Sequence, residues 1–295
     1  MSRNYVAIIY AVAAAFFYAL NIPCSKLLLQ HISPIFMAGL LYIGAGIGVG
    51  FIYLFKVKKE AKIDRLCKND LPYTLGMVIL DVVAPILLMF GVKYGLSSNA
   101  SLLGNFEIVA TTLIAVLVFK ERVSWRLWIA VFLIVVSSII LTFERTQKLE
   151  VSLGSLFVLG ATICWGLENN CTRKISNKST YQIVTIKGIC SGVGSVLVSV
   201  IVDDIYFAIE YVPLALLLGF VAYGLSIFTY IRAQRYLGAA KTSAFYSIAP
   251  FIGAFLGFVL LKETLSLQYV LALLVMIVGT IFLVYDTKVI ETHQN

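Results

Sequence analysis

Long apolar stretches separated by short polar connections run along almost the entire chain. A helix needs roughly 20 predominantly apolar residues to cross the hydrocarbon core of a bilayer. Ten stretches have about that length, and we expect each to form a transmembrane helix: 5–29, 35–55, 72–92, 98–119, 125–143, 153–172, 182–201, 213–231, 241–261 and 267–285. Only one connection, 56–71, is sizeable, so no soluble domain is left over. The pattern predicts an all-α integral membrane protein with ten transmembrane helices.

The composition agrees with residence in a membrane. Of the 295 residues, 60% are hydrophobic and 13% are charged, and the mean hydropathy is +0.95. Soluble globular proteins carry about 25% charged residues. This chain cannot cover its surface with charge, so we exclude the soluble classes and expect membrane lipid around it.

Basic residues are distributed unevenly between the connections. The formal net charge of +8 would suggest a nucleic-acid partner in a soluble protein. Here most Lys and Arg residues lie before the first apolar segment or after an even-numbered one, as in 56–68 and 120–126. Lys and Arg concentrate in cytoplasmic loops. We therefore expect no nucleic-acid partner, a multi-pass location in the cytoplasmic membrane of the cell, and both termini in the cytoplasm.

The two halves of the chain resemble each other. The stretch Tyr18–Lys26 aligns with Trp165–Arg173, and Phe119–Ser124 aligns with Leu261–Ser266. These matches divide the chain into two predicted repeats of five helices, 1–147 and 148–295. Because five is odd, the second repeat enters the membrane upside down. Inverted-topology repeats are typical of secondary transporters, whose binding site lies near the repeat interface and the bilayer midplane.

The same elements carry a resemblance to a known family. The motif Trp165-Gly166-x-Glu168-Asn169 opens the second repeat, and the two aligned helix-end elements each precede a final apolar helix. In these features the chain resembles the drug/metabolite transporter superfamily, EamA type, over nearly its whole length. The resemblance implies ten helices around a central cavity. It also implies transport of solutes such as amino acids, amines, nucleotides, sugars or drugs.

The resemblance is incomplete in the fourth predicted helix. Many members of the superfamily carry a proline in the fourth and ninth helices. Pro250 fits this pattern, whereas the aligned position holds Ile108, next to Glu107. The difference places a carboxyl group where relatives are often neutral.

Glu168 lies inside an apolar segment, where inserting a charge costs about 2.5–3.5 kcal/mol. It therefore needs a partner, a water-filled cavity or a function. Lys187 stands at a similar depth if the sixth and seventh segments form a hairpin. One interpretation is a structural ion pair, and the other is a Glu168 carboxyl that titrates or meets a substrate amine. Lys187 and Arg232 are also candidates for binding a substrate carboxylate.

Asp81 and Glu107 lie near the middle of the third and fourth apolar segments. Neither has a basic residue at matching depth in a helix next to it in sequence. Desolvation disfavours the charged form of a carboxyl group. Both are therefore candidate proton carriers, and the alternative is a protonated, hydrogen-bonded structural carboxyl.

Further polar and aromatic side chains are candidates for the wall of a substrate or proton site. Those singled out are Tyr18, Asn21, Asn105, Trp165, Asn169, Asn170 and Tyr246. Aromatic faces beside carboxylates suit organic cations. The alternative for each aromatic residue is packing or contact with lipid.

Nothing in the chain has the pattern of an enzyme or a metal site. The five cysteines and two histidines lack metal-ligand spacing, and no glycine-rich phosphate loop occurs. We expect no metal and no other cofactor. A lipid-acting membrane enzyme is the least favoured class because it would need a catalytic cluster.

The sequence favours a secondary transporter that moves a small polar organic metabolite by alternating access. An amino acid, an amine or a similar solute is favoured because buried acids outnumber buried bases, and protons are a candidate coupling ion. The alternatives are a facilitative uniporter, a channel-like pathway and a non-transporting scaffold. The oligomeric state does not follow from the sequence.

Overall fold

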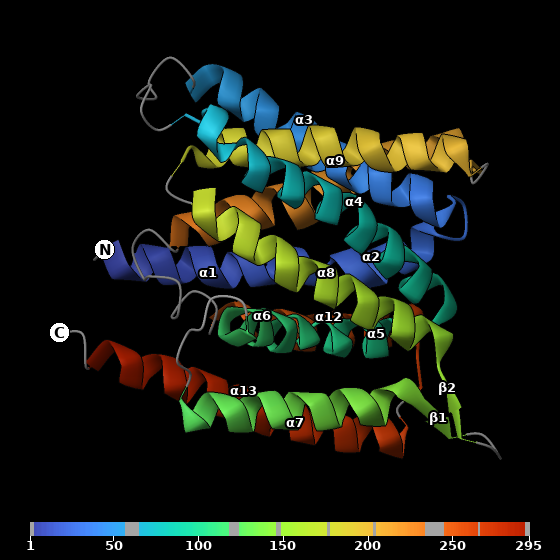
Figure 1. The fold of residues 1–295 in the computed structure, drawn as a ribbon. Coiled ribbons are helices and arrows are strands. Elements are labelled where there is room, and N and C mark those ends of the chain that lie inside the picture. Colours follow the sequence, from blue (N-terminus) through green and yellow to red (C-terminus); the bar gives the residue numbers. More distant parts are fainter. Residues whose placement is uncertain are drawn as a thin grey trace.

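The computed structural model of the protein is a bundle of helices (Figure 1). It describes residues 3–56, 65–117, 124–145, 149–175, 178–202, 205–233, 245–264 and 266–292. The α-helices of the first half are α1 (Arg3–Ala19), α2 (Asn21–Leu28), α3 (Pro34–Lys56), α4 (Leu71–Tyr94), α5 (Ser97–Leu103), α6 (Phe106–Leu117) and α7 (Trp125–Thr142). Those of the second half are α8 (Leu153–Ile175), α9 (Thr180–Ile201), α10 (Val212–Gly219), α12 (Ala249–Leu261) and α13 (Leu267–Thr292).

Shorter elements connect these helices. They are the 3-10 helices η3 (Lys68–Asp70) and η4 (Ile209–Tyr211), the π-helix η5 (Phe220–Leu225), and the strands β1 (Phe143–Arg145) and β2 (Leu149–Val151). Residues 226–233 are helical and continue directly from η5. The strands pair antiparallel and link the two halves. The prediction of a purely α-helical chain therefore missed one short hairpin.

The described residues include six helical stretches that are long and apolar enough to cross a membrane. They are Val6–Leu28, Pro34–Lys56, Lys68–Tyr94, Trp125–Thr142, Thr180–Ile201 and Ile209–Ala233. Ala249–Leu261 and Leu267–Phe282 are shorter apolar helices. The two remaining predicted segments coincide with α5–α6 and with α8. Each predicted segment is thus helical over most of its described residues, while the full number of ten membrane crossings stays a prediction.

Large apolar side chains cover the outside of the bundle. Phe51, Leu54, Phe132 and Ile201 are 62%, 69%, 65% and 80% exposed, and they lie on α3, α7 and α9. A soluble monomer rarely exposes extensive apolar patches. This surface is suited to hydrocarbon, as the composition predicts.

The first and fourth predicted segments are each broken near their middle. The break between α1 and α2 lies at Leu20. Pro23 has no N–H and cannot bond to the carbonyl of Ala19. Between α5 and α6, Asn105 and Ile108 each donate to the carbonyl three residues earlier, at 3.1 Å. These tighter turns interrupt the α-helical ladder and leave two helix starts inside the bundle.

Glycines bring helices of the two halves into backbone contact. A Cβ atom at Gly188 of α9 would lie 2.3 Å from the amide nitrogen of Gly46 in α3. A Cβ at Gly219 of α10 would lie 2.0 Å from the carbonyl oxygen of Leu41. Small residues permit this approach between membrane helices. The α3–α9 and α3–α10 contacts therefore form a closely packed side of the bundle.

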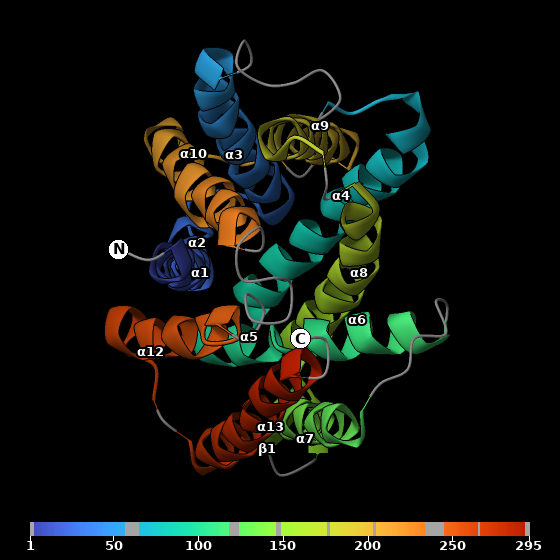
Figure 2. The same ribbon diagram turned by 90° about the vertical axis from the view of Figure 1, so that its left-hand side faces the viewer.

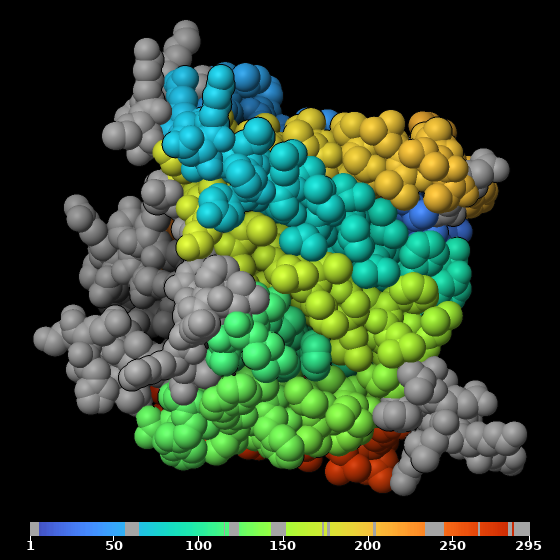
Figure 3. All heavy atoms as spheres, in the orientation of Figure 1, coloured from blue at the N-terminus to red at the C-terminus, as the bar shows by residue number. Residues whose placement is uncertain are grey.

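Figure 2 shows α7 and α13 paired at one edge of the bundle, opposite α3, α9 and α10. Across the face seen in Figure 3, α9, α4, α8 and α7 follow one another as adjacent bands. The first residues of α1 and the last residues of α13 lie on the same side in Figure 1. The hairpin lies at the opposite end, where it joins α7 to α8.

Candidate functional site

Three charged side chains meet in the interior of the bundle. Lys187 Nζ of α9 lies 3.0 Å from Asp81 Oδ2 of α4 and 3.0 Å from Glu168 Oε1 of α8. Asp81 is fully buried, and Glu168 and Lys187 are 2% and 7% exposed. One ammonium group thus stands between two carboxylates, and we call these three residues the Lys187 triad.

Hydroxyl groups complete the surroundings of both carboxylates. Tyr42 of α3 donates a hydrogen bond to Asp81 Oδ1 at 2.8 Å. Thr172, one turn beyond Glu168 on α8, donates to Glu168 Oε1. Buried charges are tolerated when they are paired and hydrogen-bonded. The Lys187 triad meets both conditions.

A chain of polar contacts leads from the triad to the break in the first segment. The ring of Tyr42 lies against that of Tyr223 in η5, with 5.0 Å between the ring centroids. Asn21 Nδ2 of α2 donates to the Tyr223 hydroxyl at 3.1 Å, and Ser25 donates to Asn21 Oδ1 at 3.1 Å. Asn21 is fully buried, so its amide belongs to this internal network.

The structure corrects one expectation about Asp81. The sequence indicated no basic residue at matching depth in the helices next to it in the chain, but Lys187 reaches it from α9, as it also reaches Glu168. The α4 and α9 helices are distant in sequence but pack together in the bundle. The possible partners of Asp81 were therefore incomplete when only helices next to it in the chain were considered. Of the two interpretations that the sequence left open for Glu168, the geometry shows the ion pair with Lys187.

Glu107 lies apart from the triad, in the first turn of α6. Its Oε1 accepts a hydrogen bond from Asn169 Nδ2 of α8 at 2.6 Å. Asn169 Nδ2 also lies 3.5 Å from Thr111 Oγ1. Glu107 is half-buried, and over the described ranges it forms no ion pair. The partial positive charge of a helix start favours a carboxylate at this position.

Glu107 is electrostatically coupled to Glu168 and Lys187. With every group ionised, Glu107 and the Lys187 triad together carry three negative charges and one positive charge. Excess charge in a low-dielectric interior is unfavourable. In that state, either a cation or a proton on one of the carboxyl groups would reduce the excess charge.

Tyrosine rings border the same region. Tyr18 of α1 lies 6.2 Å from Tyr223 and 5.8 Å from Tyr246, measured between ring centroids. Tyr246 in turn lies 5.0 Å from Tyr230. Glu107 is close enough to Tyr18 and Tyr246 to interact with them electrostatically. Aromatic side chains from both halves of the chain therefore lie near the Glu107 carboxyl group.

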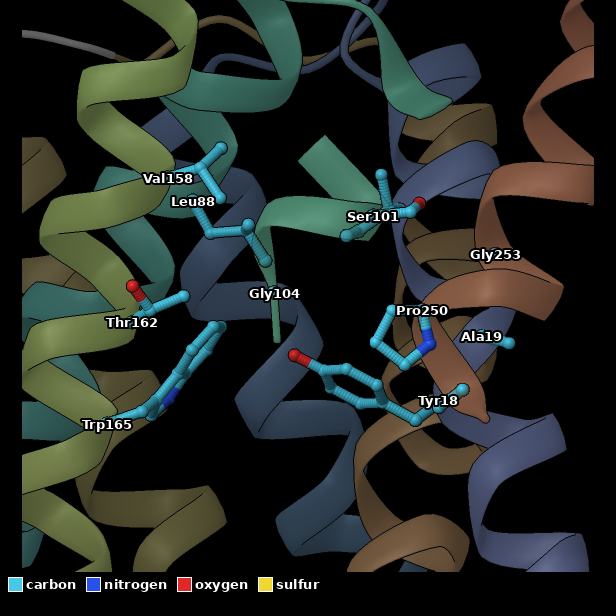
Figure 4. Close-up of a pocket in the computed structure, with 12 residues that line it drawn as sticks. Tyr18, Ala19, Leu88, Ser101, Gly104, Val158, Thr162, Trp165, Pro250 and Gly253 are labelled. Atoms are coloured by element: carbon cyan, nitrogen blue, oxygen red, sulfur yellow. The ribbon is translucent and has the colours of Figure 1, made fainter. Parts of the chain in front are cut away.

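A narrow pocket lies beside these residues (Figure 4). The indole of Trp165 and the phenol of Tyr18 stand on opposite sides of it, and the Tyr18 hydroxyl points toward Trp165. Its wall is mostly apolar, with hydroxyl groups from Ser101 and Thr162. The lining residues come from α1, α2, α4, α5, α8 and α12, so both halves contribute.

Two other predicted site residues have local roles. Asn170 Nδ2 donates to the carbonyl of Gly166 in its own helix at 2.8 Å. Asn105 is 3% exposed at the break between α5 and α6, and its Nδ2 has no hydrogen-bond partner. The structure therefore associates Asn169, rather than Asn170, with an acidic group.

The basic residues considered for binding a substrate carboxylate are engaged elsewhere. Lys187 is held between Asp81 and Glu168. Arg232 donates from Nη2 to the Tyr181 hydroxyl at 3.0 Å. Over the ranges that the structure describes, no three His, Cys, Asp or Glu side chains gather closely enough to hold a metal ion.

Four polar side chains of the site were not predicted from the sequence, namely Tyr42, Thr111, Thr172 and Tyr223. Thr172 and Thr111 lie one turn from Glu168 and Glu107, so helical spacing could have indicated them. Tyr42 and Tyr223 contact the network across helices, and nothing in their sequence spacing distinguishes them from the other tyrosines.

Comparison with known proteins places this geometry in a wider context. The model of the EamA-like transporter family matches residues 5–143 and 152–285. An uncharacterized transporter of Methanothermobacter thermautotrophicus is 25% identical over 303 residues, which cover 97% of this chain and 87% of the relative. The uncharacterized transporter YyaM of Bacillus subtilis is 21% identical, over 73% of this chain and 74% of its own length.

One solved structure has a similar fold. A crystal structure described only as that of a protein superposes with a TM-score of 0.69. The superposition covers 94% of each chain, and the sequences are 14% identical. At this identity the comparison shows the fold alone.

Proposed function

The chain belongs to the EamA-like transporter family, and from that premise we propose that it is a secondary transporter for a small polar organic metabolite. It is a multi-pass membrane protein and a transporter rather than an enzyme. The proposed solute is an amine, an amino acid or a similar metabolite. The proposed mechanism is alternating access across the cytoplasmic membrane.

The observation that carries the proposal is the half-buried carboxyl group of Glu107, which forms no ion pair with the residues that the structure describes. Asp81 and Glu168 share the ammonium of Lys187, whereas Glu107 receives one amide hydrogen bond from Asn169. A carboxylate in such a place is stabilised by a cation. The proposal assigns that role to the substrate ammonium, with a proton as the alternative occupant.

The surroundings of Glu107 fit an organic cation. The faces of aromatic rings attract ammonium groups, by about 0.5–1 kcal/mol when exposed and about 2 kcal/mol when desolvated. Tyr18 and Tyr246 supply such rings near the carboxyl group. Because Lys187 is already neutralised, a substrate with an ammonium group is favoured over a purely anionic one.

The Lys187 triad has a different proposed role. It joins α4, α8 and α9 and is almost fully buried. The ion pairs of its two carboxylates with the one ammonium group hold these three helices in register. The triad also keeps one uncompensated negative charge, which a coupling proton could neutralise. Binding and coupling would then occupy neighbouring groups.

Alternating access would use the two predicted repeats, 1–147 and 148–295. The packing partners α3–α9, α5–α12 and α7–α13 join the second, fourth and fifth segments of one half to their counterparts in the other. Broken helices near the centre are a common feature of transporter binding sites. These observations support two halves that rock about a central site, with both termini in the cytoplasm.

A flux measurement tests the function. Purified protein in proteoliposomes would be supplied with radiolabelled amino acids, aliphatic monoamines and diamines, with and without a proton gradient. The proposal predicts saturable uptake of at least one of these solutes. Uptake of none of them would contradict the assigned substrate class, and uptake without saturation would indicate a channel-like pathway.

A further inference from the structure

A carboxylate of the second half caps a helix of the first half at one end of the bundle. Glu263 directly follows α12 and the left-handed residue Lys262, whose φ is 53°. Its Oε1 accepts the backbone N–H of Ser97 at 2.7 Å, and its Oε2 accepts that of Ser98 at 2.9 Å. These amides open α5, and hydrogen bonds to a charged group are stronger than neutral ones. We call this interaction the Glu263 clasp.

A lysine holds the other side of the same turn. Lys26 Nζ of α2 donates to the backbone carbonyls of Val92, Lys93 and Gly95, at 2.6, 3.0 and 2.7 Å. These carbonyls are at the C-terminal end of α4, where a positive charge is favourable. Lys26 and Glu263 also attract each other. The α4–α5 turn is therefore held by a cation on one side and an anion on the other.

Lys26 and Glu263 belong to different halves of the chain. Lys26 and the turn that it binds are both in the first half, so they move together when the halves rock. Glu263 is in the second half and binds across the interface. Separation of the halves at this end must break the Glu263 clasp and leaves the Lys26 contacts in place.

The helices of the clasp, α5 and α12, also supply part of the wall of the pocket in Figure 4, through Ser101 and Gly253. On α12, a Cβ at Gly257 would lie 3.2 Å from Ser98 N and 3.4 Å from Glu263 Oε2. A Cβ at Gly253, which lines the pocket, would lie 3.0 Å from Ser101 Oγ. The α12 helix thus packs closely on α5 from the pocket to the clasp.

We propose that the Glu263 clasp is the releasable lock that closes this end of the transport pathway. This end lies opposite the first residues of α1, which makes it the external side in the proposed orientation. When the carboxylate of Glu263 leaves the amides of Ser97 and Ser98, α12 separates from α5 and the pocket opens outward. The inference goes beyond the proposed function, because it names the contact that controls access.

Thiol accessibility tests the lock without any knowledge of the substrate. Thr162 lines the pocket, is fully buried, and its hydroxyl donates to the carbonyl of Leu159 in its own helix, so Thr162→Cys is a suitable reporter. The five native cysteines are first replaced by serine or alanine: Cys24, Cys67, Cys164, Cys171 and Cys190. A membrane-impermeant maleimide is then added to intact cells and, separately, to inverted membrane vesicles.

The Glu263→Ala variant is expected to label faster than the parent in intact cells. The rise is at least on the order of tenfold, which corresponds to about 1.4 kcal/mol, because the substitution removes both hydrogen bonds of the clasp. Glu263→Gln keeps one acceptor oxygen without the charge and is expected to label at an intermediate rate. The Gln variant also serves as the test if the Ala protein fails to accumulate.

Glu210→Ala is the matched control. Glu210 is an exposed acid in η4, near the same end of the bundle, where Phe207 bridges to Ile32. It is expected to label at the parent rate. An unchanged rate in the Glu263 variants, an equal rise with Glu210→Ala, or an equal rise in inverted vesicles would overturn the lock. Because the measurement needs no substrate, its failure is distinguishable from failure of the proposed function.

Discussion

Lys187 of α9 and Asp81 of α4 form a buried ion pair with 3.0 Å between Nζ and Oδ2, and Glu168 approaches the same nitrogen at 3.0 Å. A single ammonium group therefore compensates two carboxylates inside a membrane protein. Glu107 has no such partner among the described residues, and it is the acid that we propose meets the solute.

Replacing Lys187 with methionine should strongly destabilise the fold. The change leaves Asp81 and Glu168 without their cation, and removing one member of a buried pair costs about 3–5 kcal/mol. Thermal unfolding in detergent measures this loss. Adding Asp81→Asn and Glu168→Gln to Lys187→Met should restore part of the stability. A Lys187→Met protein as stable as the wild type would show that the triad is not structural.

Tyr42→Phe should weaken the same region by a smaller amount. The substitution removes the hydroxyl that donates to Asp81 Oδ1 and keeps the ring against Tyr223. A hydrogen bond to a charged group contributes about 1.5–3 kcal/mol. Tyr206→Phe is the control, since Tyr206 is 65% exposed and surface changes are usually within about 0.5 kcal/mol. Equal unfolding temperatures for the two variants would contradict the assignment.

Gly188→Ala should separate α9 from α3. A Cβ at this position would lie 2.3 Å from the Gly46 amide nitrogen, so one backbone must move. Overpacking of this kind costs about 1–3 kcal/mol. At Gly160 the nearest atom is a flexible Leu87 side chain at 3.3 Å, so Gly160→Ala should be neutral or stabilising. Thermal unfolding distinguishes the two, and a harmless Gly188→Ala would refute the close α3–α9 contact.

The elements of the fold follow largely from the sequence, because a bilayer requires long apolar helices with internally bonded backbones. The break at Leu20 is less evident, although Pro23 indicated disturbed backbone bonding there. The break at Gly104 and Asn105 lies within an apolar run that reads as one continuous helix. Helix-breaking turns of this kind depend on tertiary contacts more than on local pattern.

The site was only partly predictable. The Glu168–Lys187 pair was one of two interpretations of the sequence, since a hairpin of adjacent helices fixes their relative depth. The contact of Lys187 with Asp81 was missed, because it depends on which distant helices pack together. Asn169 was singled out through its motif, yet its bond to Glu107 needed the α6–α8 packing. Tyr42 was missed for the same reason.

The central claim is that the Glu107 carboxyl group binds the cationic part of the solute. Initial uptake rates in proteoliposomes test it directly, using the best-transported amine or amino acid, for wild type, Glu107→Gln and the exposed control Glu210→Gln. The account predicts that Glu107→Gln loses saturable uptake by a factor on the order of ten or more, since a contact to a charged group is worth at least about 1.4 kcal/mol. Glu210→Gln is expected to transport at the wild-type rate. Wild-type uptake by a folded Glu107→Gln protein would contradict the account.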